Sequence, residues 1–376
     1  MLGEKRNRIL LAGLLFSIFT IPMYIALSTS KAQQTFEEYK NQQDKEYANY
    51  LKEENEAFEK YVREVEAKWI EFQNSTKRDW FEYSHDLNTL SHVDFEKGKI
   101  IIETLVEQSA GDPMERASRN IKDKIAGLFE VDSLTHDVIL ENQVEFNSPP
   151  IIDSTNARLF AREKVLSTAE IQKETVKSSD GIERVKVTAT IEMVPDHIRL
   201  RAEKYLPVVR KYCAKYKLEI PLVMAIMETE SFFNPRAKSP VPAFGLMQLV
   251  PRSGAREAYR FVHKEDKIVK ANYLYTPENN IHLGCAYLAK MRDYEFKSIK
   301  DINKIRLCLI AAYNTGPGNV CKAIVGERKL KPAMTEINDM DSDELFEVLK
   351  DDLPFKETRD YLVKVESRRG NYAQWN

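Results

Sequence analysis

The chain has 376 residues, enough for two domains, because a single hydrophobic core rarely grows beyond roughly 250–300 residues. Lys and Arg number 56 and Asp and Glu 58, and this balance argues against the basic surface of a nucleic-acid-binding protein. Charged residues make up 30% and hydrophobic residues 43%, which is typical of a helix-rich soluble protein and not of a disordered or multi-spanning one.

The N-terminus has the pattern of an export signal. Lys5, Arg6 and Arg8 precede an uncharged apolar run over residues 9–28, and this run is about long enough to span a bilayer. A small-x-small cleavage pattern ends at Ala32. We favour a signal peptide over residues 1–32, with membrane attachment through 9–28 as the alternative, and thus an exported protein of the periplasm or cell envelope. The segment has no lipid-anchoring Cys, so we do not expect a lipoprotein.

Residues 36–72 nearly repeat every 11 residues, with aromatic side chains at Phe36, Tyr47, Phe58 and Trp69. Eleven residues correspond to about 3.67 residues per turn, so the pattern predicts one long amphipathic helix with an aromatic stripe. We expect the stripe to pack against its own domain or the same helix of a second copy. Docking to a membrane or to a partner in an envelope complex is the alternative.

The segment that follows has the pattern of a small α+β domain. The expected elements are a hairpin over 93–106 with its turn at 96–99, helices over 116–129 and 156–166, and an alternating strand over 185–191. Strand-like patterning stops near Val194-Pro195, and helical patterning continues from Asp196 to about Tyr216. We therefore predict an α+β domain over 33–194 and a mainly α domain over 195–376, and we see no catalytic constellation in the first.

The residues that commonly bind metals show no ligand spacing. The four cysteines, Cys213, Cys285, Cys308 and Cys321, include no C-x-x-C pair, and Cys285 and Cys308 have the surroundings of buried free thiols. His197, His263 and His282 are also not spaced as ligands. We predict neither a metal nor another cofactor.

A short apolar helix carries the best candidate for catalysis. Pro221 opens it, and it should end before Asn234, because the residue before Pro235 disfavours the α conformation. Glu230 then lies near its C-terminus, where burial and the helix dipole both raise the pKa of a carboxyl toward that of a general acid. Glu228 is about 200° away around the helix, so we expect a surface or salt-bridged side chain there and no paired-acid dyad.

Four motifs follow in order, starting at Glu230 (ESxFNP), Phe244 (FGLMQ), Ala312 (AYNxG) and Glu357 (ETRxY). Together they resemble the successive motifs of the lysozyme-like lytic transglycosylases, whose fold is shared with goose-type lysozyme. The junction over 191–205 is similar to that of a membrane-bound, lipid-anchored member of this family. This chain departs from the family in lacking the lipid-bearing Cys and in the Pro-rich turn over 239–243.

The resemblance implies a function and a set of site residues. Glu230 would act as the one catalytic acid and base on peptidoglycan strands, cleaving the bond between N-acetylmuramic acid and N-acetylglucosamine to leave 1,6-anhydro ends. The residues expected to contact substrate or orient the acid are Ser231, Gln248, Tyr313, Asn314 and Tyr361, with Met247 as a core or groove-wall residue of the same site.

Two other functions compete with this one. A hydrolytic muramidase on the same fold would need a second carboxylate about 6.5–9.5 Å from Glu230 if it were inverting, and Glu265 and Asp266 are conceivable. A non-catalytic scaffold that binds the cell wall is the third possibility, although the intact Glu230-Ser231 pair argues against it.

Overall fold

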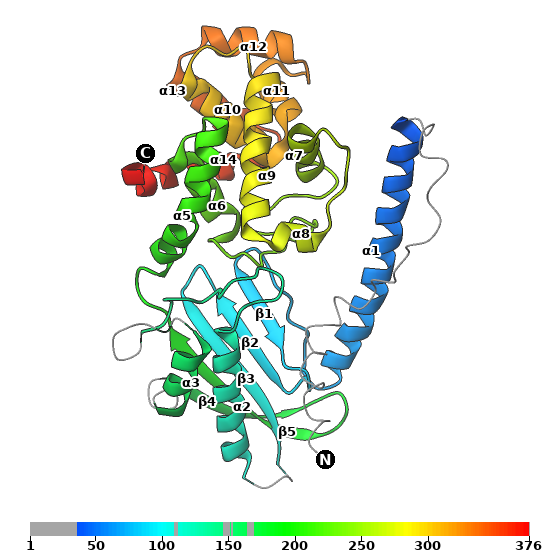
Figure 1. The fold of residues 1–376 in the computed structure, drawn as a ribbon, viewed down its shortest axis with the longest axis vertical. Helices are drawn as coiled ribbons and strands as arrows, with labels where there is room; N and C mark the ends of the chain where they lie inside the picture. Colours follow the sequence, from blue (N-terminus) through cyan, green and yellow to red (C-terminus); the bar gives the residue numbers. More distant parts are fainter. Residues whose placement is uncertain (1–35, 109–111, 146–150, 152, 164–168, 376) are drawn as a thin grey trace.

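The computed structural model describes residues 36–108, 112–145, 151, 153–163 and 169–375 (Figure 1). The predicted export segment, residues 1–32, lies outside this part of the chain. Among the residues described, no helix is both long and apolar enough to cross a membrane.

A five-stranded antiparallel sheet in the order β1-β2-β3-β5-β4 forms the centre of the N-terminal half. Its strands are β1 (Asp79–Tyr83), β2 (Thr89–Asp94), β3 (Lys99–Glu107), β4 (Glu170–Lys177) and β5 (Glu183–Glu192). The predicted hairpin is confirmed as β2 and β3, and the predicted strand is the middle of β5. The sequence did not predict β1 and β4, because both are edge strands and β4 buries only Val176, so apolar alternation is missing.

Helices α2 (Pro113–Leu128) and α3 (Ser154–Glu163) pack with one face of the sheet into a shared apolar core (Figure 1). Both predicted helices are confirmed with shifted ends. Helix α2 starts three residues early because the Asp112 side chain accepts the N–H groups of Met114 and Glu115, an N-cap that fixes its first turn. The last predicted residues of the second helix, 164–166, lie outside the described residues.

Helix α1 (Phe36–Glu66) ends six residues before the predicted position. The turn between β4 and β5 supplies the donors that stop it: the Ser179 hydroxyl donates to the Glu66 carbonyl at 2.6 Å, and the Asp180 N–H donates to Ala67 O at 3.2 Å. These hydrogen bonds provide donors for carbonyl groups at the end of the helix, which in a longer helix would accept from the next turn. The end of α1 is therefore set by a tertiary contact.

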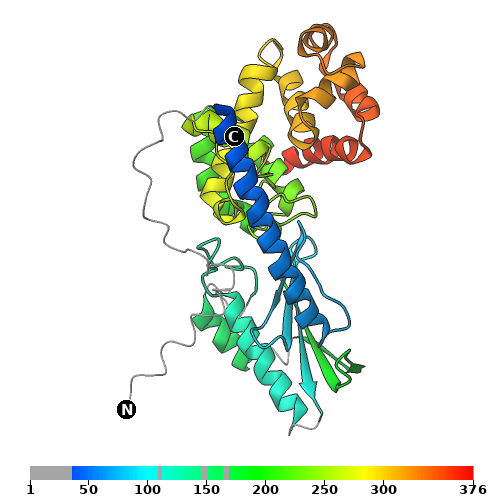
Figure 2. The same cartoon turned by 90° about the vertical axis from the view of Figure 1, so that its right-hand side faces the viewer.

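We expected the aromatic stripe of α1 to pack against its own domain or a second copy, but part of it packs against the C-terminal half of the same chain. Three cations from the C-terminal half lie over its rings: Arg252 over Tyr47, Lys270 over Tyr50 and Lys238 over Phe58, at 5.7, 4.7 and 5.7 Å from the ring centroids. Asp44 on the same helix accepts from Arg256 at 3.1 Å. Figure 2 shows α1 running along both halves of the molecule. The helix therefore braces the two halves together.

The C-terminal half is a compact group of helices (Figure 1). They are α5 (His197–Tyr216), α6 (Ile220–Ser231), α7 (Gly254–His263), α8 (Ala271–Tyr275), α9 (Pro277–Lys290) with a π-helical end (Met291–Glu295), α10 (Ile302–Thr315), α11 (Pro317–Val325), α12 (Leu330–Asp339), α13 (Ser342–Asp352), α14 (Lys356–Arg369) and a final 3-10 helix (Gly370–Trp375). Helix α6 buries nearly all of its side chains and lies in the main core, as its uniformly apolar sequence predicts.

A buried arginine joins the two halves. Arg201 of α5 is 1% exposed, and its guanidinium donates to Phe95 O at 2.6 Å and to the Gln143 side chain at 2.7 Å, both in the N-terminal half. It also donates to Phe232 O at 3.0 Å, directly after α6. Burial lowers the pKa of Arg201 to about 9, so the group stays protonated at neutral pH.

We predict that Arg201→Met lowers the free energy of unfolding by about 3 kcal/mol, because three buried oxygens lose their donor. Urea denaturation of the full chain measures this loss. Arg199→Met is the matched control, because this side chain, two positions away, is exposed and pairs with Asp196 and Glu203. The urea concentration at the midpoint of its unfolding should hardly differ from that of the wild type. Equal midpoints for the two variants would contradict the structural role of Arg201.

Candidate functional site

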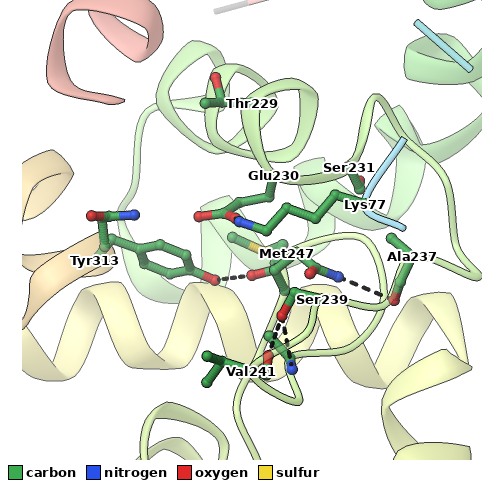
Figure 3. Close-up of polar contacts among 12 residues, drawn as sticks. Lys77, Thr229, Glu230, Ser231, Ala237, Ser239, Val241, Met247 and Tyr313 are labelled. Carbon is green, nitrogen blue, oxygen red and sulfur yellow. Dashed lines mark hydrogen bonds and ion pairs between the residues drawn. The ribbon is translucent and has the colours of Figure 1, made fainter. Parts of the chain in front are cut away.

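Glu230 lies in the last turn of α6, and only 4% of it is exposed. Its carboxyl oxygen Oε2 is 3.2 Å from Nζ of Lys77, which belongs to the loop between α1 and β1 (Figure 3). The two residues are 153 positions apart in the chain. The surroundings of the candidate acid therefore come from both halves of the molecule.

Opposing influences act on the pKa of the Glu230 carboxyl. Burial is the strongest, and it raises the pKa above the ordinary value of 4.5. The positive charge of Lys77 and the nearby Tyr361 hydroxyl lower the pKa, and the negative charge of Glu357 raises it. The net direction is upward, as we predicted, and such a carboxyl holds its proton closer to neutral pH, as general acid catalysis requires.

The segment after α6 connects Glu230 with both cores. Phe232 and Phe233 have φ of 51° and 59°, so the chain turns sharply directly after the helix. The Phe232 ring enters the core of the N-terminal half, whereas Phe233 is buried in the core around α6. The predicted end of the helix before Asn234 is confirmed, and Phe232, to which the sequence assigned nothing, anchors the interface between the halves.

The FGLMQ motif forms a tight loop in which Phe244 and Leu249 exchange two backbone hydrogen bonds of 3.1 Å. Asn280 on α9 holds this loop, because its side chain accepts the Met247 N–H and donates to Phe244 O, each at 2.8 Å. Gly245 has φ +75°, and a Cβ there would lie 2.4 Å from Asn280 Nδ2. The motif glycine is therefore required by close packing, and Asn280 is a supporting residue that sequence reasoning missed.

Ser231 and Met247 are fully buried. The Ser231 hydroxyl is within hydrogen-bond distance of Leu246 O at 2.8 Å and Met227 O at 3.1 Å, so it ties α6 to the motif loop. The Met247 side chain packs so closely on α9 that a Cβ at Gly284 would lie 2.2 Å from its sulfur. Both side chains belong to the interior that supports the site, and neither lies on an open surface.

Two of the predicted site residues have a buried polar atom without a hydrogen-bond partner in the described part of the chain. One is Oε1 of Gln248, whose amide nitrogen already donates to Ala237 O and Gly245 O. The other is the hydroxyl of Tyr361 on α14, which is near enough to Glu230 to lower the pKa of its carboxyl. Buried polar atoms are normally paired, so these two are exceptions within the described chain.

Tyr313 and Asn314 reach the site from the C-terminal end of α10, and both are half-buried. The Tyr313 hydroxyl donates to Met247 O at 2.7 Å, and burial together with the charge of Glu230 raises its pKa (Figure 3). Asn314 Oδ1 accepts from the Thr358 hydroxyl at 2.7 Å, which links α10 to α14. The structure thus gathers predicted residues of the other three motifs around Glu230, which belongs to the first.

Two of the other acidic residues considered from the sequence, Glu228 and Asp266, are engaged elsewhere. Glu228 is buried, pairs with Arg368 at 3.0 Å and accepts from the Tyr372 hydroxyl at 2.6 Å, so a surface position was the wrong alternative and a salt bridge the right one. Asp266 accepts from Arg256 through both oxygens, at 2.7 and 2.9 Å. This pairing argues against Asp266 as a free second carboxylate.

One cluster has donor atoms close enough to hold a metal ion: Asp79, His92 and Asp94, all within 4.8 Å. Its groups already bond one another and the chain, with His92 2.7 Å from Asp79 and Asp94 accepting the N–H groups of Glu96 and Lys97. We assign it a structural role at the edge of the sheet. All four cysteines are free and buried, in agreement with the expectation for Cys285 and Cys308.

Comparison with known proteins relates both halves to one kind of protein. Residues 207–334 match the model of the transglycosylase SLT domain, and residues 41–204 match that of the N-terminal domain of membrane-bound lytic murein transglycosylase C. The 70 kDa soluble lytic transglycosylase of Escherichia coli is 26% identical, with a TM-score of 0.35, over 46% of this chain and 24% of its own.

Two curated relatives cover most of the chain. The membrane-bound lytic murein transglycosylase C of Serratia proteamaculans is 32% identical over 78% of this chain and 81% of its own length. The protein of the same description from Pectobacterium atrosepticum is 33% identical over 78% of this chain and 82% of its own. With matches of this extent in both halves, the chain belongs to the family of membrane-bound lytic murein transglycosylase C.

Proposed function

We propose that this chain is a peptidoglycan lytic transglycosylase that cleaves the β-1,4 bond between N-acetylmuramic acid and N-acetylglucosamine and leaves 1,6-anhydro-muramyl ends. Family membership supports the reaction class. The observation that carries the assignment of the acid is Glu230, a buried carboxyl with a raised pKa at the first family motif. Its ion-pair partner among the described residues is Lys77.

In this mechanism Glu230 serves both halves of the reaction. Its carboxyl donates a proton to the glycosidic oxygen as the bond to C1 of the muramyl residue breaks. The resulting carboxylate takes the proton of the muramyl 6-hydroxyl, whose oxygen bonds to C1 and closes the anhydro ring. The proton returns to Glu230, so the reaction consumes no water and requires no second carboxylate.

The remaining site residues divide into two groups in our proposal. Gln248 and Tyr361 would contact the sugar, because each has a buried polar atom without a partner, and half-buried Tyr313 and Asn314 would line the approach. Ser231 and Met247 would support the acid and the motif loop, because both are fully buried.

The substrate places the protein in the cell envelope, and the relatives are described as membrane-bound. We propose that residues 1–32 direct export to the periplasm, with residues 9–28 as the segment that attaches the chain to a membrane if it is retained. The proposal assigns Tyr47, Tyr50 and Phe58 of helix α1 to contacts within the chain, because basic side chains of its C-terminal half lie over these rings.

We predict that Glu230→Gln lowers the release of muropeptides from purified sacculi by about 10²–10⁴-fold, the usual contribution of a general acid. Mass spectrometry of the wild-type products should find anhydro-muramyl ends, lighter by one water than reducing ends. Reducing ends would indicate a hydrolytic muramidase, which needs a second carboxylate. Glu357, whose negative charge raises the pKa of Glu230, would then be the first candidate to substitute. Wild-type release no greater than that of the variant would favour a wall-binding scaffold.

Glu228→Gln is the matched control, because it makes the same change two positions away in the same helix. We expect this variant to keep the anhydro products and to unfold at lower temperature, since it weakens a buried pair with Arg368. Loss of cleavage by a folded Glu228→Gln chain, with Glu230→Gln active, would move the acid to the other carboxylate.

The pH dependence follows from the pKa of Glu230. The protonated carboxyl is the working form in the first step, so kcat/KM should fall as pH rises through the pKa of Glu230, which burial raises above 4.5. Initial rates between about pH 4 and about pH 9 locate this alkaline limb. A rate that increases throughout that range would show that the ionised form starts the reaction.

A further inference from the structure

The loop that carries Lys77 is fixed against the C-terminal half on both sides of this residue. Thr76 O accepts the backbone N–H of Lys238 at 3.3 Å. Arg78 pairs with Glu96 at 2.5 Å and lies 5.4 Å from the centroid of the Phe232 ring. Because its neighbours on either side are held, the backbone of Lys77 has a defined position, and its side chain extends along Glu230 (Figure 3).

The interface behind this loop is extensive. Arg201 bonds to both halves, Arg236 donates to Asp132 of the N-terminal half at 2.9 Å, and the Phe232 ring is part of the N-terminal core. Each of these contacts would have to break before Lys77 could move away with its domain. The lysine is therefore a built-in part of the surroundings of Glu230 and not a chance surface contact.

The charged and titratable groups around Glu230 come from three elements. Lys77 approaches from the loop before β1, Glu357 and Tyr361 from α14, and Tyr313 from α10. Among the residues that the structure describes, no other Lys or Arg is ion-paired with Glu230, and nearby Arg368 is engaged with Glu228. The Lys77 side chain is 35% exposed and that of Glu230 only 5%, so a partly exposed cation pairs with a buried carboxyl.

We propose that Lys77 is a positioning residue of the active site, contributed by the N-terminal domain, which orients the Glu230 carboxyl and stabilises its ionised form during the reaction. The proposal rests on the assignment of Glu230 as the acid. It makes the N-terminal domain a part of the catalytic unit.

The chemistry of a one-carboxyl cycle explains why such a cation is useful. In the proposed cycle the neutral carboxyl starts the reaction, and Lys77 interacts with that form only weakly. Once the proton has passed to the glycosidic oxygen, the carboxylate would be a buried charge without compensation, and Lys77 stabilises it at that moment. The interaction is thus stronger after proton transfer than before it, which lowers the barrier instead of merely tightening binding. Burial acts in the opposite direction and raises the pKa of this carboxyl.

Two substitutions in the full chain test this role. Lys77→Met removes the charge and keeps the length of the side chain, whereas Lys77→Arg keeps the charge. We expect Lys77→Met to lower kcat by about tenfold or more. We also expect it to move the alkaline limb of kcat/KM up by about one pH unit, because Glu230 loses a nearby positive charge. Lys77→Arg should restore the limb to its wild-type position.

A structural role alone would give a different result. The proposal is overturned if a folded Lys77→Met chain loses rate equally at every pH or loses none. It is also overturned if Lys77→Arg fails to restore the alkaline limb of kcat/KM to its wild-type position. Lys238→Met is the matched control: its side chain lies over Phe58 at the same interface, so it removes a charge without an ion pair to Glu230. Its pH limb should stay in place.

Failure of the proposed function would be recognised separately. A wild-type chain that releases no more muropeptide than Glu230→Gln would sink the assignment of the acid. The ion pair can still be tested in that case by following the titration of the Glu230 carboxyl by ¹³C NMR. The Glu230 pKa should be higher in Lys77→Met than in the wild type, and an unchanged pKa overturns the proposal for Lys77 whatever the activity.

Discussion

The structure depends on one requirement, that a fully buried guanidinium must find acceptors. Arg201 has no access to water, and the three oxygens that surround it come from the hairpin turn of the sheet, from the segment after α2 and from the residue that follows α6. An unpaired charge in this position would lower the free energy of unfolding by several kcal/mol, roughly the size of a whole domain's stability. Because these acceptors belong to different halves of the chain, the halves can dock in only one way.

The same docking fixes the end of α6, where the candidate acid lies. Phe232 and Phe233 adopt a backbone conformation that bulky residues avoid, and the fold tolerates it because each ring is buried in a different core. Glu230, two residues earlier, is therefore held against a domain boundary. Its burial and its cationic neighbour have opposite effects on its pKa, and both arise from the way the two halves meet.

The sequence predicted what local patterns can encode. The hairpin and the helices α2, α5 and α6 follow from periodicity and turn residues, whereas the gathering of motif residues around Glu230 follows from the family resemblance. What escaped prediction depends on partners far away in the chain: the end of α1 is set by Ser179, the motif loop is held by Asn280, and Lys77 meets Glu230 only through domain docking. Nothing in the local sequence of Lys77 distinguishes it from the many exposed lysines of this chain.

The brace formed by α1 has a consequence for the order of folding. Asp44 and Arg256 are 212 positions apart, so the first helix of the described chain waits for a partner that is synthesised much later. Its aromatic side stays uncovered until the segment around Arg252 to Lys270 has folded, because those cations lie over its rings. Closing so long a loop is slow, and we expect the docking of α1 to be a late step in maturation.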